Sequence, residues 1–486
     1  MTVAIVWFRR DFRLADNPAL AAALKAYDRI LPVYIEAPDE EAPWAPGAAS
    51  RWWLHHSLTS LDADLSRRGA SLHVRRGSTF ETLRALVDET RASAVYWNRL
   101  YEPAIVARDS RIKESLRASG IDAQSFNASL LFEPWDVATG QHTPYKVFTP
   151  FWRNARARLE VRQPLRAPRS IDSPHLGGGL AIEALDLLPK TRWDAGFVKA
   201  WTPGEAGAHK ALDRFLEDAI GDYAVRRDVP AEHGTSRLSP HLHFGEISPM
   251  QVVASLEAAS HGSAKRRAGA ETYLREIGWR EFSHHLLYHF PESAERNLDP
   301  AFDAFPWARL SAARLARWKR GTTGIPIVDA GMRELWATGW MHNRVRMLVA
   351  SFLTKNLRQH WLAGARWFWD TLVDADLANN TQGWQWTAGS GADASPYFRV
   401  FNPVTQGERF DPDGEYVRRW VPELAAFERK TIHKPWTDAE RLRASGYPKP
   451  MVDLDTSREA ALAAYRTCKA PGHPHVEARS ARKKRR

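Results

Sequence analysis

Short apolar runs alternate with helical patterns over the first 130 residues, and no other feature restricts the possible folds so much. The expected strands are residues 3–8, 30–35, 71–74, 94–97 and 122–126, and the expected helices are 17–27, 49–68, 79–90 and 103–118. The first of these strands is apolar throughout, as is typical of a strand that is buried on both faces. Strands that alternate with helices predict a parallel, doubly wound α/β sheet.

The glycine-rich turn with which many such sheets bind phosphate is absent. After the first expected strand the chain continues F-R-R-D-F-R-L (8–14), without a G-x-G-x-x-G motif. A dinucleotide is therefore not expected at that turn. The main cofactor of the protein need not lie in this part of the chain.

The length of 486 residues favours two domains. Frequent proline and the G-G-G at 177–179 predict an inter-domain linker over residues 131–200, which we expect to cross the surface. Helical periodicity dominates beyond the linker, at 205–219, 249–259, 270–288, 325–337 and 342–356. We therefore predict an α/β domain (1–130), the linker (131–200), a mainly α-helical domain (201–470) and a basic tail (471–486).

The charge of the chain suggests a nucleic-acid partner. Lys and Arg number 68 against 57 Asp and Glu, a net charge of +11. A basic enzyme without such a partner is the alternative. Cys468 is the only cysteine, which excludes an intrachain disulfide and a cysteine-ligated cluster. No signal peptide and no run of about 18 apolar residues is present, so we expect no membrane contact and a cytoplasmic location, or a nuclear one in a eukaryote.

Tryptophan occurs together with charged and amide residues near the end of the chain. The segments are W-M-H-N-R-V-R-M (340–347), D-A-D-L-A-N-N-T-Q-G-W-Q-W (374–386) and S-P-Y-F-R-V-F-N-P (395–403). A solvated surface has no use for so many Trp, and a plain core has no use for so many Arg and Asp. This mixture is expected where a protein holds a large, flat, partly charged ligand beside an anionic polymer.

Spacing separates the roles of these residues. Asn343 and Met347 share one face of the expected helix, whereas Arg344 lies about 100° away and points towards another partner. Arg346 and Asp374 are candidates for a buried ion pair, and a solvated face is the alternative for both arginines. In the W-Q-W at 384–386 the two tryptophans would face opposite ways if the segment were extended.

Two short polar motifs have a simpler alternative. In G-T-S-R-L-S-P (234–240) the hydroxyls of Thr235, Ser236 and Ser239 precede an expected helix and can cradle a phosphate, although an ordinary helix cap is the more common use of such residues. His285 and His289 have the i, i+4 spacing of zinc ligands. Without a third ligand we interpret them as structural and predict no metal site.

Five motifs together resemble the photolyase/cryptochrome family. They are W-F-R-R-D-F-R-L-A-D-N-P-A-L (7–20), G-T-S-R-L-S-P, W-R-E-F (279–282), W-M-H-N-R-V-R-M and W-Q-W-T-A-G-S-G (384–391), in the family's order. The similarity is greatest to class I cyclobutane pyrimidine dimer photolyases. It implies that a folded FAD lies in the helical domain, which would then be an FAD-binding and DNA-binding domain.

The resemblance also assigns residues. The FAD-binding positions are Tyr223, Thr235, Ser236, Arg237, Leu238, Ser239, Asn343, Arg346, Asp374, Asp376 and Asn380. The positions for the lesion and its DNA are Arg227, Glu276, Trp279, Asn343, Arg344, Met347, Trp386 and Arg399. Glu276 and Asn343 would act on the dimer, and Trp384, Trp361 and Trp307 would relay electrons to the flavin.

The activity implied is light-driven repair of pyrimidine dimers by electron transfer from reduced, anionic FAD. The partner would be damaged DNA, single- or double-stranded and of any sequence, and the protein would be a monomer. A cryptochrome-type blue-light photoreceptor is the alternative, and a light-independent flavin oxidoreductase is a more distant one. A second, antenna chromophore would lie in the N-terminal domain near Asn98 and Glu102, and the sequence leaves open both its presence and its identity, with a folate, a deazaflavin and another flavin as the options.

Overall fold

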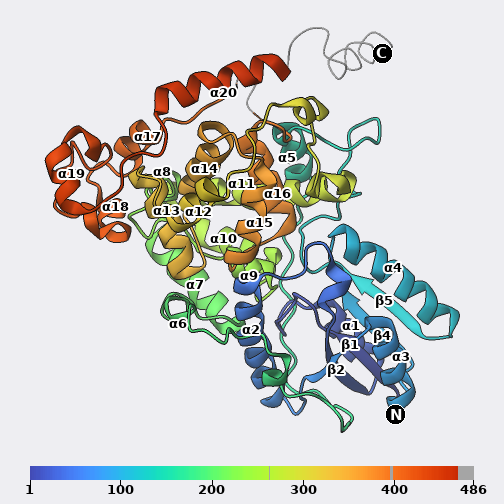
Figure 1. Ribbon diagram of the computed structural model, residues 1–486. Helices are drawn as coiled ribbons and strands as arrows, with labels where there is room; N and C mark the ends of the chain where they lie inside the picture. The colour runs from blue at the N-terminus through green and yellow to red at the C-terminus, as the bar shows by residue number, and fades with distance from the viewer. Residues whose placement is uncertain (262, 395–397, 469–486) are drawn as a thin grey trace. The chain divides into compact units, whose positions relative to one another are not determined.

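The computed structural model describes residues 1–261, 263–394 and 398–468, which form two compact units (Figure 1). Unit 1 consists of Met1–Ala224, Thr235–Pro291 and Val373–Leu377, and unit 2 consists of Val225–Gly234, Glu292–Leu372 and the described residues from Ala378 onward. The predicted basic tail and residues 395–397 of the S-P-Y-F motif lie outside the described residues.

A five-stranded parallel sheet of strand order β3-β2-β1-β4-β5 lies in unit 1. The strands are β1 (Val3–Trp7), β2 (Arg29–Glu36), β3 (His73–Arg76), β4 (Ala94–Asn98) and β5 (Asp122–Phe126). The strand order reverses between β1 and β4, as it does in doubly wound sheets, so the predicted α/β class is confirmed. Only β3 begins later than expected, because the Leu72 N–H donates to Asp62 Oδ1 (2.8 Å) instead of to a neighbouring strand.

Helices cover both faces of this sheet. They are α1 (Pro18–Ala26), α2 (Ala48–Ser66), α3 (Thr79–Thr90) and α4 (Pro103–Ala118), with the 3₁₀ turn η1 (Pro38–Glu41) after β2. Leu83 of α3 and Ile112 of α4 pack on the face that carries Ile5 and Trp7. α1 packs on the strands from the other side, and the Asn17 side chain caps it by accepting the Leu20 N–H (3.1 Å).

Residues 131–200 do more than cross the surface. They contain α5 (Phe148–Ala157), the 3₁₀ turn η2 (Ile182–Leu185) and α6 (Ala195–Ala200). Phe148 and Phe151 of α5 are each 1% exposed and pack against Phe282 of α11 (Ala264–His289). The expectation of a surface linker was therefore wrong for α5, because the F-x-x-F spacing of an amphipathic helix outweighs the prolines around it.

The remaining helices of unit 1 include the predicted ones. They are α7 (Glu205–Asp218), η3 (Ile220–Asp222), α9 (Ser239–His243), α10 (Pro249–Ser260) and α11, while α8 (Tyr223–Arg226) begins in unit 1. A core of apolar side chains joins α7, α10 and α11, with Leu212, Leu256 and Ile277 among them. Helical periodicity therefore predicted this part of the fold.

Unit 2 is helical throughout its described residues, apart from loops. Its helices are α12 (Ala312–Arg320), α13 (Pro326–Thr338), α14 (Asn343–Ser351), α15 (Trp361–Thr371), α16 (Leu377–Ala388, whose first residue belongs to unit 1), α17 (Pro403–Phe410), α18 (Glu415–Trp420), α19 (Ala439–Ser445) and α20 (Leu454–Cys468). Short 3₁₀ turns join them, namely η4 (Pro291–Ala294), η5 (Pro300–Ala304), η7 (Pro422–Leu424) and η8 (Pro435–Thr437).

Two local predictions in unit 2 need correction. The helix expected at 342–356 is α14 followed by a π-helical turn, η6 (Phe352–Asn356), and such turns are frequent at functional sites. The W-Q-W segment is helical and not extended, since it lies within α16. Residues two apart on a helix differ by about 200°, so Trp384 and Trp386 still point to roughly opposite sides.

No helix among the described residues is long and apolar enough to cross a membrane.

Glu281 fixes the start of the 131–200 segment to α11. Its side chain is 3% exposed, and Oε2 accepts the N–H groups of Leu131 (2.9 Å) and Phe132 (3.2 Å). Burial raises the pKa of Glu281 to about 7, against its ordinary value of 4.5. The folded protein therefore binds a proton at this site at pH values where the unfolded chain has lost it.

We predict that Glu281→Gln reduces the dependence of stability on pH. The contribution from protonated Glu281 is fully present below about pH 4.5 and is lost as the pH rises through about 7. Between pH 5 and pH 8 the free energy of unfolding, measured with urea, should fall in the wild type by roughly 2–3 kcal/mol more than in Glu281→Gln. Glu271→Gln, at an exposed position of α11, is the control, and equal pH dependences in both variants would contradict the prediction.

Candidate functional site

The segment before α9 brings hydroxyl and N–H groups together in unit 1. Ser236 Oγ lies 2.8 Å from Tyr273 Oη and accepts the Leu238 N–H (3.3 Å). Arg237 has a φ of 55°, a left-handed conformation that turns the chain there, and its guanidinium lies 4.3 Å from the Trp201 ring centroid. α9 has only five residues, so the cradle depends on these side chains and loop N–H groups rather than on a helix dipole.

Aromatic rings form one wall beside these hydroxyls. The ring of Tyr273 lies 5.2 Å from that of Tyr223 and 4.7 Å from that of Phe215. Burial raises the pKa of Tyr273 to about 12, so its hydroxyl stays neutral. Tyr223, Ser236 and Tyr273 are thus brought together, which supports a site for a ligand with both flat and phosphate groups.

Asp376 is a buried anion in the same unit. Its Oδ2 lies 3.5 Å from His243 Nδ1 and 3.4 Å from His284 Nε2, and all three side chains are less than a tenth exposed. Burial alone would raise the pKa of Asp376, but His284 and His243 hold it well below its usual range. Asp374 is 8% exposed in the same segment. The carboxylate of Asp376 is therefore ionised and can accept hydrogen bonds from a ligand.

Neither histidine was predicted. His243 follows the hydroxyl motif and His284 is adjacent to the His285 that the sequence singled out. His285 instead interacts with the Pro134 carbonyl (3.0 Å) and accepts the Tyr145 N–H (3.0 Å), which occupies both ring nitrogens. No group of three or more potential metal ligands occurs in the part of the chain that the structure describes.

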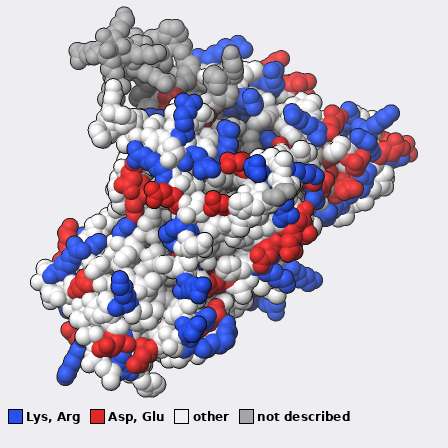
Figure 2. All heavy atoms as spheres, turned by 180° about the vertical axis from the view of Figure 1, so that it is seen from behind, with Lys and Arg blue, Asp and Glu red and all other residues white. Residues whose placement is uncertain are grey.

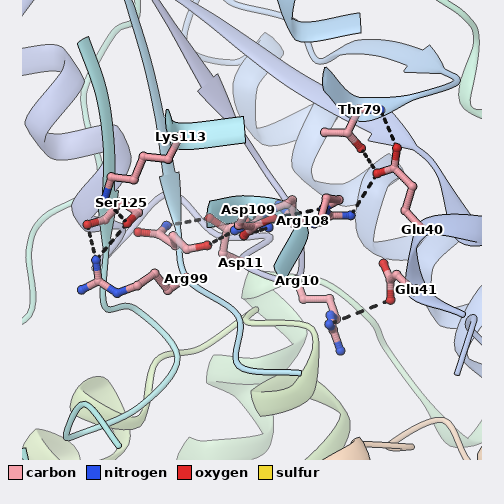
Figure 3. Close-up of polar contacts among 12 residues, drawn as sticks. Arg10, Asp11, Glu40, Glu41, Thr79, Arg99, Arg108, Asp109, Lys113 and Ser125 are labelled. Carbon is pink, nitrogen blue, oxygen red and sulfur yellow. Dashed lines mark hydrogen bonds and ion pairs between the residues drawn. The ribbon is translucent and has the colours of Figure 1, made fainter. Parts of the chain in front are cut away.

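Charged side chains pair with one another at the carboxyl edge of the sheet (Figure 3). Arg10 binds Glu102 (2.6 Å) and lies 4.0 Å from Glu41, while Glu40 accepts the Thr79 N–H (2.8 Å). Asn98 donates to Asp11 (2.6 Å). The two residues predicted near an antenna chromophore, Asn98 and Glu102, are therefore both engaged by the protein itself.

A cavity of about 360 Å³ lies beside this edge. It is lined by residues from η1, from the start of α3 and from α4, namely Glu40, Ser78, Phe80, Arg108, Arg111, Ile112 and Ser115. Arg108 also binds Asp109 (3.0 Å) and lies 3.5 Å from Glu40.

Trp279 and Glu276 share one side of α11, being three residues apart. The Trp279 ring stacks on Phe148 of α5 at 3.7 Å with an interplanar angle of 9°. One face of the indole is thereby fixed against the protein. Trp279 is a half-buried, rigid platform, as a stacking residue for a base requires.

In unit 2, α14 carries a second group of predicted residues. His342 caps the helix, since its Nδ1 accepts the Arg344 N–H (3.2 Å); burial lowers the pKa of His342 to about 4 and keeps it neutral. Asn343 is the first helical residue. Arg344 binds Asp228 (2.7 Å), but its Nη1 also lies 3.8 Å from Met347 Sδ, so the Arg344 side chain is not separated from Met347 as expected.

Trp386 and Arg399 line one small cavity of about 30 Å³. Lys355 of the π turn also lines this cavity and was missed, because T-K-N looks like the exposed end of a helix. Its Nζ donates to the Arg399 carbonyl (3.0 Å) and lies 3.6 Å from the Phe398 ring centroid. Burial lowers the pKa of Lys355 to about 7.

The three relay tryptophans all belong to unit 2. Trp361 and Trp384 are 0% and 2% exposed, and Trp361 Nε1 donates to Asn297 Oδ1 (2.9 Å). The half-buried Trp307 lies 5.0 Å from the His360 ring, which lies 5.6 Å from that of Trp361. Aromatic rings thus connect Trp361 to the partly exposed Trp307.

The Trp384 ring can occupy its position because residue 364 is a glycine. A Cβ on Gly364 of α15 would lie 2.0 Å from the Trp384 ring, which is far inside van der Waals contact. On the same helix as Trp384, Asn380 Nδ2 donates to the Ala365 carbonyl (3.0 Å) and leaves its Oδ1 to accept.

The predicted ligand residues are divided between the two units. Unit 1 contains Tyr223, Thr235–Ser239, Glu276, Trp279, Asp374 and Asp376, and unit 2 contains Arg227, Asn343, Arg344, Arg346, Met347, Asn380, Trp386 and Arg399. Arg346 Nε donates to the Met341 carbonyl (2.7 Å), and its pairing with Asp374 stays a prediction. Within unit 1 the hydroxyls, the aromatic wall and the anionic Asp376 form a donor and acceptor set that fits a dinucleotide such as FAD.

Known proteins are similar to this chain over most of its length. Two family models match the chain, DNA photolyase over residues 4–169 and the FAD binding domain of DNA photolyase over residues 273–467. The deoxyribodipyrimidine photo-lyase of Agrobacterium fabrum is 48% identical over 96% of this chain and 98% of its own length. Cryptochrome-1 of Arabidopsis thaliana is 40% identical over 94% of this chain and 69% of its own length.

Solved structures show the same relationship. A bacterial class III photolyase from Agrobacterium tumefaciens has a TM-score of 0.92 and 47% identity, with 97% of this chain and 98% of that chain covered. An archaeal photolyase from Sulfolobus tokodaii, solved with two FAD molecules, has a TM-score of 0.82 and 30% identity over 96% of this chain and 100% of that chain. The chain therefore belongs to the photolyase/cryptochrome family, as an FAD-binding enzyme of the photolyase type.

Proposed function

We propose that this protein repairs cyclobutane pyrimidine dimers in DNA with light. The observation that carries the proposal is the fixed aromatic and acidic pair on α11, where Trp279 stacks on Phe148 and Glu276 lies one turn away. Such a pair can stack on a pyrimidine and hydrogen-bond its carbonyl groups. The photo-lyase relative at 48% identity supports the same activity.

A dimer inside a duplex has to leave the base stack before these side chains can reach it, as is general for photolyases among base-flipping enzymes. Unstacking costs a few kcal/mol, and less for a damaged base. Stacking on an aromatic side chain returns roughly 1–3 kcal/mol per base. Trp279, and Trp386 in unit 2, would therefore offset the extrusion of a dimer but not that of two well-paired bases.

We propose that the FAD-binding positions are those that the family resemblance implies. They are Tyr223, the 235–239 segment, Asp374 and Asp376 in unit 1, and, considered separately, Asn343, Arg346 and Asn380 in unit 2. Bound and reduced, FAD would supply the light-excited electron that opens the cyclobutane ring and would receive it back afterwards. Glu276 and Asn343 would hydrogen-bond the pyrimidine carbonyls and stabilise the negative charge that develops on them. The anionic Asp376 would accept hydrogen bonds from the cofactor.

The protein's partner would be damaged DNA of any sequence. On the face shown in Figure 2, Lys and Arg are interspersed with Asp and Glu and do not form one continuous basic patch. We assign the phosphate contacts to Arg227, Arg344 and Arg399. Such contacts give sequence-independent, salt-sensitive affinity. We further propose a monomer that acts in the cytoplasm.

Two finer points concern subclass and antenna. The solved relative described as a class III photolyase makes class III better supported for this chain than the class I expected from its motifs. A second chromophore would lie in the N-terminal α/β part of unit 1. The archaeal relative that was solved with two FAD molecules supports a second, antenna chromophore.

A light sensor is the second candidate, because cryptochromes are among the relatives at 40% identity. It would share the FAD and the relay through Trp384, Trp361 and Trp307 but would not repair DNA.

The main test is repair itself. The FAD-loaded protein should restore dimer-containing DNA under blue light and leave it unchanged in darkness, measured as loss of dimers by chromatography. Undamaged DNA serves as the control for non-specific photochemistry. A yellow, light-reducible protein that repairs nothing would refute the proposal and favour the sensor.

We predict that Glu276→Ala lowers the repair yield per absorbed photon by about tenfold, the worth of a hydrogen bond to a charged group. FAD content, read from the absorption spectrum, should not change, because Glu276 is assigned to the dimer and not to the cofactor. Glu271→Ala on the exposed side of the same helix is the matched control. An unchanged yield in Glu276→Ala would remove this residue from the reaction.

We predict that Gly364→Ala displaces Trp384 and slows photoreduction of bound, oxidised FAD. The added Cβ would lie 2.0 Å from the indole, so the ring must move, at a cost of roughly 1–3 kcal/mol in stability. Gly383→Ala is the matched control on α16, since a Cβ there meets no atom within 4 Å. Equal photoreduction rates in the two variants, measured with an external reductant, would argue against Trp384 as the first relay residue.

A further inference from the structure

We propose that Asp228 determines how strongly the protein binds undamaged DNA, by holding Arg344 in an ion pair that only dimer-containing DNA displaces. The inference rests on the proposed DNA-repair function and concerns the same site. It assigns to Asp228 a role in specificity, exerted through Arg344.

The guanidinium of Arg344 is held from several directions within unit 2. Nη2 lies 2.7 Å from Asp228 Oδ1, and Cζ lies 4.4 Å from the ring centroid of Phe410. Nη1 lies 3.8 Å from Met347 Sδ. The Arg344 side chain is 22% exposed and that of Asp228 is 36% exposed, so both remain within reach of a ligand in solution.

Arg344 lies at a position where its positive charge is unfavourable unless the carboxylate of Asp228 pairs with it. Arg344 is the second residue of α14, where the positive end of the helix dipole disfavours a cation. Arg346 lies two residues further along α14, Arg227 precedes Asp228, and burial keeps His342 neutral by lowering its pKa. Asp228 is therefore the acidic group that binds Arg344, while Arg227 and Arg346 add further positive charge around the neutral His342.

This ion pair allows Asp228 to make the protein discriminate between undamaged DNA and dimer-containing DNA. With intact DNA, a phosphate at Arg344 would have to replace the carboxylate and then lie beside its negative charge, so the exchange brings little gain. A flipped dimer adds stacking and hydrogen bonds elsewhere in the site, which offset the broken ion pair. Arg344 would thus contact a phosphate in the dimer complex and stay with Asp228 on intact DNA.

Asp228→Asn tests the inference in the full-length, FAD-loaded protein. The binding constant for undamaged duplex, measured by fluorescence anisotropy over a series of NaCl concentrations, should rise several-fold at low salt. Its logarithmic salt slope should steepen by about 0.9, the value for one additional phosphate contact. The slope for dimer-containing duplex should stay the same, because Arg344 already contributes there.

Glu232→Gln is the matched control. It removes the same charge from the same segment, where Glu232 binds Arg226 (2.6 Å), and should leave both slopes unchanged. Adding Arg344→Gln to Asp228→Asn should abolish the gain for undamaged DNA, since the two residues act as a pair. An unchanged slope in Asp228→Asn, or an equal change in Glu232→Gln, would overturn the inference.

Failure of the proposed function would look different. Wild-type protein would then neither prefer dimer-containing DNA nor repair it in light. The slopes for undamaged DNA would still show whether Asp228 restrains Arg344.

Discussion

A carboxylate that stays ionised away from water is the constraint on which the proposed cofactor site depends. Burying a charge is costly unless opposite charges or donors compensate for the lost water. Asp376 is compensated by His243 and His284, and Arg10 at the end of β1 adds a more distant positive charge. If Asp376 became neutral, it would present a donor in place of an acceptor and change what the site can bind. The helices α9 and α11 and the loop after β1, all in unit 1, therefore have to keep their positions so that the carboxylate of Asp376 stays ionised.

Much of the fold could be predicted because its signals are local. An apolar run as short as 3–8, rich in β-branched residues, favours a buried strand, and Asn17-Pro18 marks a helix start that the structure shows as a cap. Periodicity likewise located α10 to within one residue, whereas α11 begins six residues before its expected start. The site residues that the family resemblance supplied also lie in short motifs, so Arg344 and Trp384 could be named in advance. Their partners could not.

The missed features depend on contacts between distant segments. His243 and His284 meet Asp376 only in the folded chain, and no spacing in the sequence connects them. Lys355 looks like a surface residue until the π turn directs it into the protein. Asp228 follows two arginines in a loop, where an acid is ordinarily a solvated charge. In each case burial or pairing, and not residue type, creates the chemistry.

The stacking of Phe148 on Trp279 also bears on how relatives of this protein can be recombined. Segment 131–157 contributes a ring to the platform on α11, backbone N–H groups to Glu281, and a carbonyl to His285. A hybrid of two relatives joined after residue 200 would take its 131–157 segment from the other relative. Phe148 and the neighbouring backbone would then no longer match Trp279 and Glu281. For protein engineering, residues 131–157 should therefore be inherited together with α11, whose side chains they contact.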